Sequence, residues 1–515
     1  MKHKAKEDAR LTDWLSRSFD YTSPLVQNEI LKLLGNSIVR HIAKPIQALP
    51  VLQYSIIIDG TQDISGVEQE CICIRYVDHD LVPHEAFIGL YELSGTTGEA
   101  IARVAMDVLL RLNIPVTGLR GQTYDGAANM AGVHSGVQAE IKKQQPLALF
   151  LHCGAHCLNL ITQAACQSSP LIRDALQWVH DLGTLSKISG KFKATFSAAV
   201  AASERPSASL RPLCPTRWTV RGPAVRAVLS QYDCVLSSLE EMGANNAKAN
   251  GLRDRFEKGK TVLGLNLALE VIERLEALNK SLQKRTETVA GMMSAIDCVR
   301  DSLRANRSEA KFREIFDKTE EMIDSLGIEP IQVPHQRAPP KRYTGAESQH
   351  IATAEEWYRA EYYKLMDSVD TQFEARFSQR DLKVLQELEN VLLTGAVSSV
   401  TNDYPELDSI TLKVQLSIFH SKYKVQSISD AADLFRSMTV EVRGLFDQVE
   451  TLLRLLLVMP VSSTEAERSF SALRRLKTWL RTTMTQARLN HAAVCHIHQD
   501  RLDSTQMYIC IKLKL

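Results

Sequence analysis

Two extended segments that each end on an aspartate constrain the fold most strongly. The uncharged apolar run 55–58 stops on Asp59, and the stretch 116–124 reaches Asp125 before turning through Gly126. A short apolar run bounded by turn residues is typical of a strand buried on both faces. We therefore expect two strands that each place a carboxylate at their end, although Asp-Gly is also an ordinary turn sequence.

Residues 52–153 alternate between strand and helix patterns. Three sequential strands joined by short turns must be largely antiparallel, whereas strands entered from helices need crossovers and run parallel to the first. This favours an α/β mixed sheet of order β-β-β-α-β-α-β-α, with the first and fourth strands adjacent and Thr97 as a helix N-cap. Asp59 and Asp125 would then lie where α/β sheets open their sites. The expected strands are 54–59, 70–78, 84–93, 116–125 and 147–153.

After about residue 170 the chain becomes helical in pattern, with long amphipathic stretches such as 262–283 that contain no proline. A Pro-rich basic stretch near 328–345 predicts an exposed linker, and a role in nuclear import is the less favoured alternative. The expected segments are an N-terminal helical segment 1–50, a first core part 51–169, a helical insertion 170–450, a C-terminal segment 451–500 and a tail 501–515.

Charge and cysteine content narrow the class of protein. There are 61 Lys and Arg against 60 Asp and Glu, so any nucleic-acid surface must be a local patch. No apolar run of about 18 residues predicts a membrane span, and the first residues do not resemble a secretion signal. The 10 Cys form no C-x-x-C pair, which predicts reduced thiols inside a cell and no structural zinc site.

Two aspartates on neighbouring strands, with a third carboxylate from a later helix, suit a pair of hard divalent cations. Mg²⁺ prefers carboxylate oxygens and keeps positions open for phosphate and water. Two such cations about 4 Å apart can stabilise both the attacking and the leaving oxygen of a phosphoryl displacement. This pattern is that of nucleases and polynucleotidyl transferases.

Five blocks of the sequence resemble transposases of the hAT superfamily. The blocks are "IIIDGTQDIS…CICIRYVD", "RGQTYDGAANMAG", "HCGAHCLNL", "CPTRWTV" and "SSTEAERSFSALRRLKTWLR", in that order. The resemblance implies an RNase H-like core interrupted by a large all-α insertion. It also implies a D-D-E triad that binds Mg²⁺ or Mn²⁺, carried onto Asp59, Asp125 and Glu467, and a dimerisation region at the C-terminus.

Glu465 competes with Glu467 for the third place in the triad. Residues 462–465 have the pattern of a capping box, in which Glu465 would hydrogen-bond back to the start of its own helix. Glu465 would also lie on the other flank of the apolar stripe of that helix. We therefore favour Glu467.

Two further blocks supply candidates beside the triad. Cys153 and His156 have a C-x-x-H spacing, but no second ligand pair follows, so we expect them to support the active site or to form a buried pair. Arg217 can contact phosphate and Trp218 can stack on an unpaired base. The resemblance implies a tryptophan that holds a base flipped from the DNA end, and a plain core tryptophan is the alternative.

The last helices predict a dimer. The run 452–459 should be buried, because it is aliphatic on all sides. The apolar residues Phe470, Leu473 and Leu480 lie among basic residues, and we expect Phe470 to turn inward while Trp479 and Leu480 are shared across a homodimer or higher homo-oligomer.

Two functions remain open from the sequence. One is an Mg-dependent, hAT-type transposase that cuts and joins DNA, and the other is a domesticated, catalytically silent dimer that binds DNA or protein. The D-D-E residues favour the first, whereas the lack of zinc-finger Cys/His pairs before residue 50 favours the second. For both we expect a nuclear location, with the cytoplasm also open.

Overall fold

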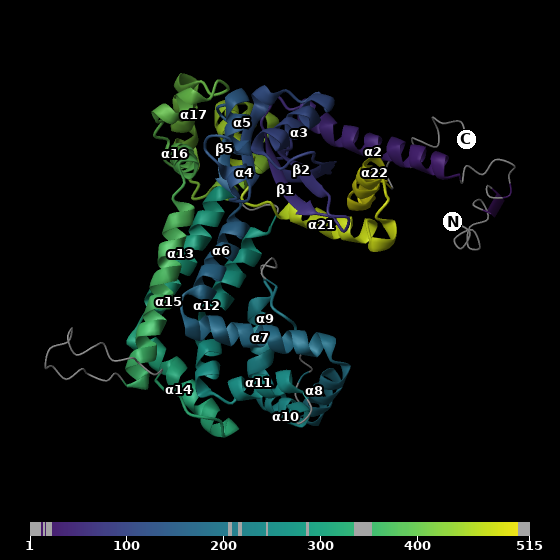
Figure 1. Cartoon of the computed structure of the whole chain (residues 1–515). Helices are drawn as coiled ribbons and strands as arrows, with labels where there is room; N and C mark the ends of the chain where they lie inside the picture. The colour runs from purple at the N-terminus through teal and green to yellow at the C-terminus, as the bar shows by residue number, and fades with distance from the viewer. Residues whose placement is uncertain are drawn as a thin grey trace. The chain divides into compact units, whose positions relative to one another are not determined.

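Two compact units make up the 515-residue chain, of which Figure 1 shows the computed structural model. The sheet unit combines the residues up to 153 with those from 384 onward, and the helical unit is formed by 154–383. The structure describes residues 12, 13, 16 and 23–502, apart from 204–205, 207–208, 215–218, 244–245, 285–287 and 334–352. The predicted linker is therefore described only to residue 333, and the predicted tail only to residue 502.

The unit boundaries differ from the segments expected from the sequence. The helical unit begins at Gly154, directly after the last strand, and ends at Lys383. Helices α17 (Ser409–Lys422) and α18 (Ile428–Ser437) read as part of the insertion, but they pack on α20 (Asp447–Leu457) in the sheet unit. Amphipathic helices look alike in sequence whichever core they cover, so periodicity alone does not locate such a boundary.

The sheet unit contains one mixed sheet of five strands, in the order β3-β2-β1-β4-β5. Strands β1 and β2 and strands β2 and β3 pair antiparallel, while β4 pairs parallel with both β1 and β5. The predicted α/β fold class, with the first and fourth strands adjacent, is confirmed. The strands are β1 (Tyr54–Gln62), β2 (Glu68–Val77), β3 (Pro83–Glu92), β4 (Leu119–Tyr124) and β5 (Leu149–His152).

The prediction that the first strand ends at Asp59 was wrong. Strand β1 continues to Gln62, because its hairpin with β2 extends the antiparallel ladder to the pair Gln62 and Glu68. The parallel ladder with β4 ends earlier, at Ile57 and Thr123. Asp59 thus lies beyond the parallel ladder but inside the antiparallel one.

Helices from both ends of the chain cover the sheet. They are α2 (Pro24–Gln47), α3 (Gly98–Arg111), α4 (Ala128–Ala131), α5 (Val137–Gln144), α21 (Thr464–Leu476) and α22 (Gln486–Ile497). The Thr97 side chain caps α3 as predicted, by accepting a hydrogen bond from the N–H of Ala100. Helix α22 packs on α2 (Figure 1) and also on the edge strand β3. The side chain of Asn490 on α22 accepts a hydrogen bond from the Leu90 N–H of β3. This contact covers part of an otherwise open sheet edge.

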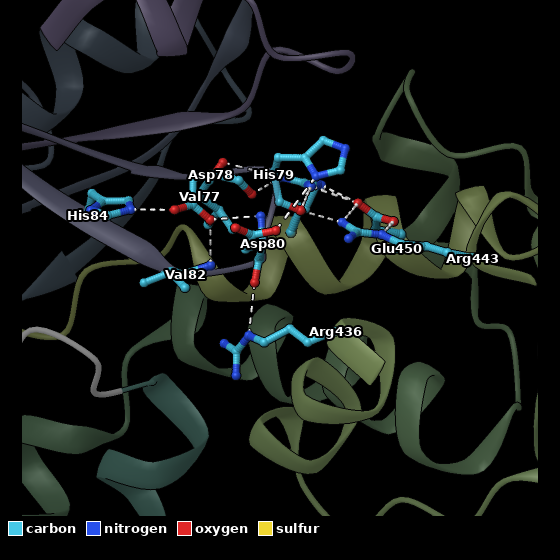
Figure 2. A network of polar contacts seen from close by, with 10 residues as sticks. Val77, Asp78, His79, Asp80, Val82, His84, Arg436, Arg443 and Glu450 are labelled. Carbon is cyan, nitrogen blue, oxygen red and sulfur yellow. Dashed lines mark hydrogen bonds and ion pairs between the residues drawn. The ribbon is translucent and has the colours of Figure 1, made fainter. Parts of the chain in front are cut away.

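Arginines from three successive helices hold the turn between β2 and β3. Figure 2 shows Arg436 of α18 and Arg443 of α19 (Val440–Gly444) pointing at this turn, with Glu450 of α20 beside Arg443. Arg443 donates to Glu450 at 2.6 and 2.7 Å and to the His79 carbonyl at 2.5 Å. The buried Arg454 donates to the same carboxylate and to carbonyls of residues 77–79. These contacts fasten α18–α20 to the end of the sheet away from Asp59.

The predicted burial of residues 452–459 is confirmed, since every residue of this run, which begins within α20 and extends two residues past its end, is buried. The run lies beside the sheet, where the carbonyl of Leu457 accepts two hydrogen bonds from the guanidinium of Arg75 on β2, at 3.2 and 3.1 Å. Arg75 is itself fully buried and pairs with Glu85 at 2.8 Å. The buried guanidinium of Arg75 thus has both a carboxylate and a carbonyl as partners, and a buried charge is costly without such partners.

The helical unit is built around α12 (Gly259–Leu282), which packs on six neighbouring helices, α6, α7, α9, α11, α13 and α14. The carboxylate of Glu276 on α12 accepts hydrogen bonds from the N–H groups of Arg221 and Gly222, at 2.8 and 3.1 Å, and so caps the start of α9. The other helices are α6 (Gly154–Gln167), α7 (Pro170–Ile188), α8 (Gly190–Ala202), α9 (Arg221–Ser230), α10 (Tyr232–Gly243), α11 (Ala247–Phe256), α13 (Val289–Asn306), α14 (Glu309–Leu326) and α15 (Ala354–Phe377). Among the helices described in either unit, none is long and apolar enough to cross a membrane.

Candidate active site

The register of the parallel strands brings two aspartates together. Ile57 of β1 pairs with Thr123 of β4. Asp59 follows Ile57 by two residues, and Asp125 follows Thr123 by two residues. Asp125 directly follows β4, and its Oδ1 accepts a hydrogen bond from the N–H of Ala127 at 3.1 Å. This short turn fixes the carboxylate at the end of the strand.

Helix α21 brings a third carboxylate to the same place. The helix contacts β1, β2 and β3, and its Ser469 hydroxyl donates to the sulfur of Cys71 at 3.1 Å. Cys71 is the antiparallel partner of Asp59, so α21 crosses the sheet beside that aspartate. The carboxyl of Glu467 lies within hydrogen-bonding reach of the Asp59 carboxyl.

Burial and neighbouring acidic charges disfavour the ionisation of Asp59 and of Glu467. Burial raises the pKa of Asp59 well above its ordinary value, and the nearby charges of Glu467 and Asp125 raise it further. Burial also raises the pKa of Glu467, although the charge of Arg474 and the hydrogen bond with Asp59 lower it in part. Simultaneous ionisation of these two neighbouring carboxyls is therefore disfavoured in the metal-free protein.

The donor chemistry of this cluster fits Mg²⁺ or Mn²⁺. Carboxylate oxygens are the ligands that such hard cations prefer, and a cation would supply the positive charge that the cluster lacks. Within the described residues, however, no three His, Cys, Asp or Glu side chains are close enough to bind one metal ion as they stand. Asp125 acts on Asp59 and Glu467 through its charge, so it would have to approach them when a cation binds.

Cys153 links two of the segments that carry the carboxylates. Its N–H donates to the carbonyl of Tyr124, the residue before Asp125, at 2.9 Å. Its sulfur accepts a hydrogen bond at 3.2 Å from the N–H of Ser463, the N-cap of α21. This geometry is consistent with the predicted supporting role of Cys153, whereas His156 lies on α6 in the helical unit.

A buried ion pair holds the other end of α21. Lys477, the residue after the helix, places its Nζ 2.5 Å from Oδ2 of Asp63, and the two side chains are 6% and 0% exposed. Asp63 also accepts hydrogen bonds from the N–H groups of Ser65 and Val67 in the turn between β1 and β2. Glu467 is thus carried by a helix that is anchored at both ends.

The predicted capping box at 462–465 was wrong. Helix α21 begins at Thr464 with Ser463 as its N-cap, so Glu465 is the second residue of the helix and not the third. The Ser463 side chain makes no capping hydrogen bond, and Glu465 is buried and pairs with Arg468 at 3.1 Å. Each of the residues Ser462, Ser463 and Thr464 could serve as the N-cap from its side chain alone. The helix begins one residue later than the capping-box pattern predicts, with Ser463 as its N-cap.

The four residues predicted for dimerisation separate into two pairs. Phe470 and Leu473 are buried in the core of the sheet unit. Trp479 and Leu480 are 74% and 76% exposed, in the short 3₁₀ helix η5 (Trp479–Arg481). Leu480, which the sequence groups with Phe470 and Leu473, lies outside their helix, because α21 stops at Leu476. Only the exposed pair is available to a partner.

Two predicted DNA contacts, Arg217 and Trp218, lie outside the described residues. A buried acidic side chain that the sequence analysis missed is Glu70 on β2, directly opposite Gly60. Burial raises the pKa of Glu70 to about 7, and the charges of Glu68 and Asp125 contribute. Gly60 was the available signal, because a glycine inside a strand often marks the close approach of another group.

Two family models match the sequence at its two ends. Residues 1–136 match the ZMYM1/FAM200, RNase-like domain, and residues 415–500 match the hAT family C-terminal dimerisation region. Two similar proteins, from Mus musculus and Homo sapiens, are both named 52 kDa repressor of the inhibitor of the protein kinase. Each is 21% identical to this chain, over alignments of 503 and 504 residues. The matches cover 90% of this chain but only 64% of each relative, so the chain spans less than two thirds of their length.

Proposed function

We propose that this chain, whose two ends match an RNase-like domain and the hAT C-terminal dimerisation region, is a hAT transposase-like protein that cuts and joins DNA strands with Mg²⁺ or Mn²⁺. One observation carries the proposal: two parallel strands and a distant helix bring the carboxyl groups of Asp59, Asp125 and Glu467 into electrostatic contact. Mutual repulsion of this kind costs stability and is typical of functional sites.

Each residue has a separate task in this proposal. Divalent cations, when bound, stabilise the charge on the attacking and leaving oxygens of a phosphodiester displacement. Asp59 and Glu467 would hold a cation through their ionised carboxylates, and the turn at Ala127 fixes the carboxylate of Asp125. Cys153 keeps the start of α21 beside the end of β4, which sets the distance between Glu467 and Asp125.

Exposed arginines next to the carboxylates suit DNA as the partner. Arg468, Arg474 and Arg475 lie exposed on α21, and Arg474 is close enough for its charge to act on Glu467. Phosphate oxygens bind such side chains without regard to base sequence, which makes binding strongly dependent on salt. A DNA substrate in turn favours a nuclear location.

A second function, a regulatory dimer that does not cut DNA, is favoured by one specific observation. The similar mouse and human proteins carry the word repressor in their names. In that case the exposed residues Trp479 and Leu480 would still serve a homodimer, and α21 would still complete the sheet unit. The two functions therefore differ at the carboxylates and not in the fold.

The deciding experiment uses the full chain with Mn²⁺ or Mg²⁺. We expect wild type to bind Mn²⁺ in calorimetry and to nick supercoiled DNA, more weakly as salt is raised. Asp59→Asn, Asp125→Asn and Glu467→Gln should each reduce nicking at least about 100-fold, the scale of losing one charge-stabilising group. The control is Glu99→Gln, an exposed carboxylate on α3. A wild type that neither binds Mn²⁺ nor nicks DNA would establish the regulatory dimer instead.

A further inference from the structure

A cavity of about 420 Å³ lies within the helical unit, between α7, α12 and α15. Its lining is mostly apolar and includes the indoles of Trp178 on α7 and Trp357 on α15. Concave, mostly apolar cavities of this size are typical of sites for small organic ligands. All of its lining residues belong to 154–383, so this cavity is no part of the candidate active site.

Close helix packing builds the walls of this cavity. Ala175 and Trp178 are three residues apart and share one face of α7. Helix α12 packs so closely on this helix that a Cβ atom on Gly264 would lie 2.9 Å from the Cβ of Ala175. On α15, the buried Tyr358 donates a hydrogen bond from its hydroxyl to the carbonyl of Gln332 at 2.9 Å. The cavity is therefore formed by elements that are fixed by their own packing.

The two indoles suit a flat aromatic ring. Trp178 and Trp357 are each half-buried where they line the cavity, so part of both indole surfaces is open to a ligand. The guanidinium of Arg255 lies over the Trp178 ring, 5.2 Å from its centroid, and helps to fix this side chain. Indoles stack favourably on other planar rings. The lining thus favours an aromatic ligand over an aliphatic one.

The charges around the cavity favour a ligand that is negative. Its two acidic lining residues each have a basic neighbour, and the pairs are Glu361 with Lys364 at 3.9 Å and Asp174 with Arg173 at 3.0 Å. Lys260, in the first turn of α12, also lines the cavity and is exposed. Together with Arg255 it adds positive charge that these acidic residues do not balance.

We propose that this cavity binds a small planar aromatic anion, with its ring against the indoles of Trp178 and Trp357 and its negative group toward Lys260. A cation of the same shape would bind less well, because it would meet the charges of Lys260 and Arg255. The proposal concerns the helical unit alone, and it does not depend on the carboxylates of the sheet unit.

The test compares two ligands that share one ring and differ in charge. Calorimetry with the full chain should show indoleacetate, an anion, binding about two- to fivefold more tightly than tryptamine, a cation, which is the scale of one exposed ion contact. Acetate alone should not bind measurably, because it offers no ring to the indoles. Equal or tighter binding of tryptamine, or no binding of either aromatic ligand, would overturn the proposal.

Substitutions then assign the ring and the charge to separate residues. Trp178→Leu and Trp357→Leu should each weaken both aromatic ligands at least about fivefold, the scale of losing one stacking contact. Lys260→Glu should reverse the preference in favour of tryptamine. Lys280→Glu is the matched control and should leave it unchanged, because Lys280 is exposed in the last turn of the same helix.

Circular dichroism and thermal unfolding establish that each variant is folded. Unchanged affinities in both tryptophan variants, or an unchanged preference in Lys260→Glu, would place the ligand elsewhere and overturn the assignment of this cavity. Either result leaves the proposed function standing, since nicking of DNA and binding of Mn²⁺ are measured separately.

Discussion

Lys477→Met is expected to destabilise the sheet unit strongly and to loosen the helix that carries Glu467. The Nζ of Lys477 lies 2.5 Å from Asp63, in a pair whose side chains are 6% and 0% exposed. Removing one partner of a buried pair leaves the other charge uncompensated, which costs about 3–5 kcal/mol. Because Asp63 keeps hydrogen bonds from Ser65, Val67 and Gln69, we expect the lower end, about 3 kcal/mol.

The effect of this substitution depends on pH. Burial raises the pKa of Asp63, but hydrogen bonds from Lys477 and two backbone N–H groups, with the charge of Lys477, outweigh it and hold the pKa below its ordinary value. A lowered folded-state pKa gives stability that is present above the unfolded pKa and is lost as pH falls through the folded one. The difference between wild type and Lys477→Met should therefore be full near pH 7 and shrink below about pH 4.

Urea unfolding measures the free energy, and hydrogen exchange of the α21 amides locates the effect. Asp63→Asn combined with Lys477→Met should regain part of the loss, since no charge is then left buried. Arg103→Met is the control, because its ion pair with Glu99 is exposed and should not change stability measurably. A loss below about 1 kcal/mol for Lys477→Met, the range of an exposed pair, would refute the reasoning.

Four further outcomes follow from the contacts in the sheet unit. Trp479→Ala/Leu480→Asp should convert a dimer into a folded monomer in sedimentation, since both side chains are exposed, and an unchanged mass would place the interface elsewhere. Cys153→Ala should cost about 1–3 kcal/mol in urea unfolding, more than Cys153→Ser, by removing the acceptor for the α21 N-cap. Arg454→Met should cost about 3 kcal/mol in the same assay, because it leaves Glu450 with one arginine fewer. Asp59→Asn should stabilise the metal-free protein by about 1 kcal/mol near pH 7, seen as a higher Tm in EDTA.

The strand order and the meeting of Asp59 with Asp125 could be predicted from local patterns. Period-two alternation, short turns and the need for crossovers leave few topologies for five strands and their helices. The prediction failed at the end of β1, because the antiparallel partner and not the apolar run decides where that strand stops. The sequence of a strand shows which of its side chains can be buried, but it does not show how many of its residues will pair with the neighbouring strand.

The contacts that position Glu467 could not be predicted from the sequence. Cys153 and Ser463 are 310 residues apart, and Asp63 and Lys477 are 414 apart. No helical or strand periodicity connects residues at such distances, since each pattern describes only its own element. Glu70 was missed for a related reason: its burial depends on the absence of a side chain on the neighbouring strand.

The carboxylates distinguish the two proposed functions better than the fold does. Helix α21 fills the core with Phe470 and Leu473 whether or not Glu467 has chemistry to perform. By contrast, burial and the charges of Glu467 and Asp125 raise the pKa of Asp59, and Glu70 buries an unpaired oxygen. A dimer that only binds would be more stable with neutral residues at these positions, because the acidic groups contribute repulsion and no packing. Their presence in one chain, at one end of one sheet, is therefore an argument for cation-dependent chemistry that the exposed pair Trp479 and Leu480 does not provide.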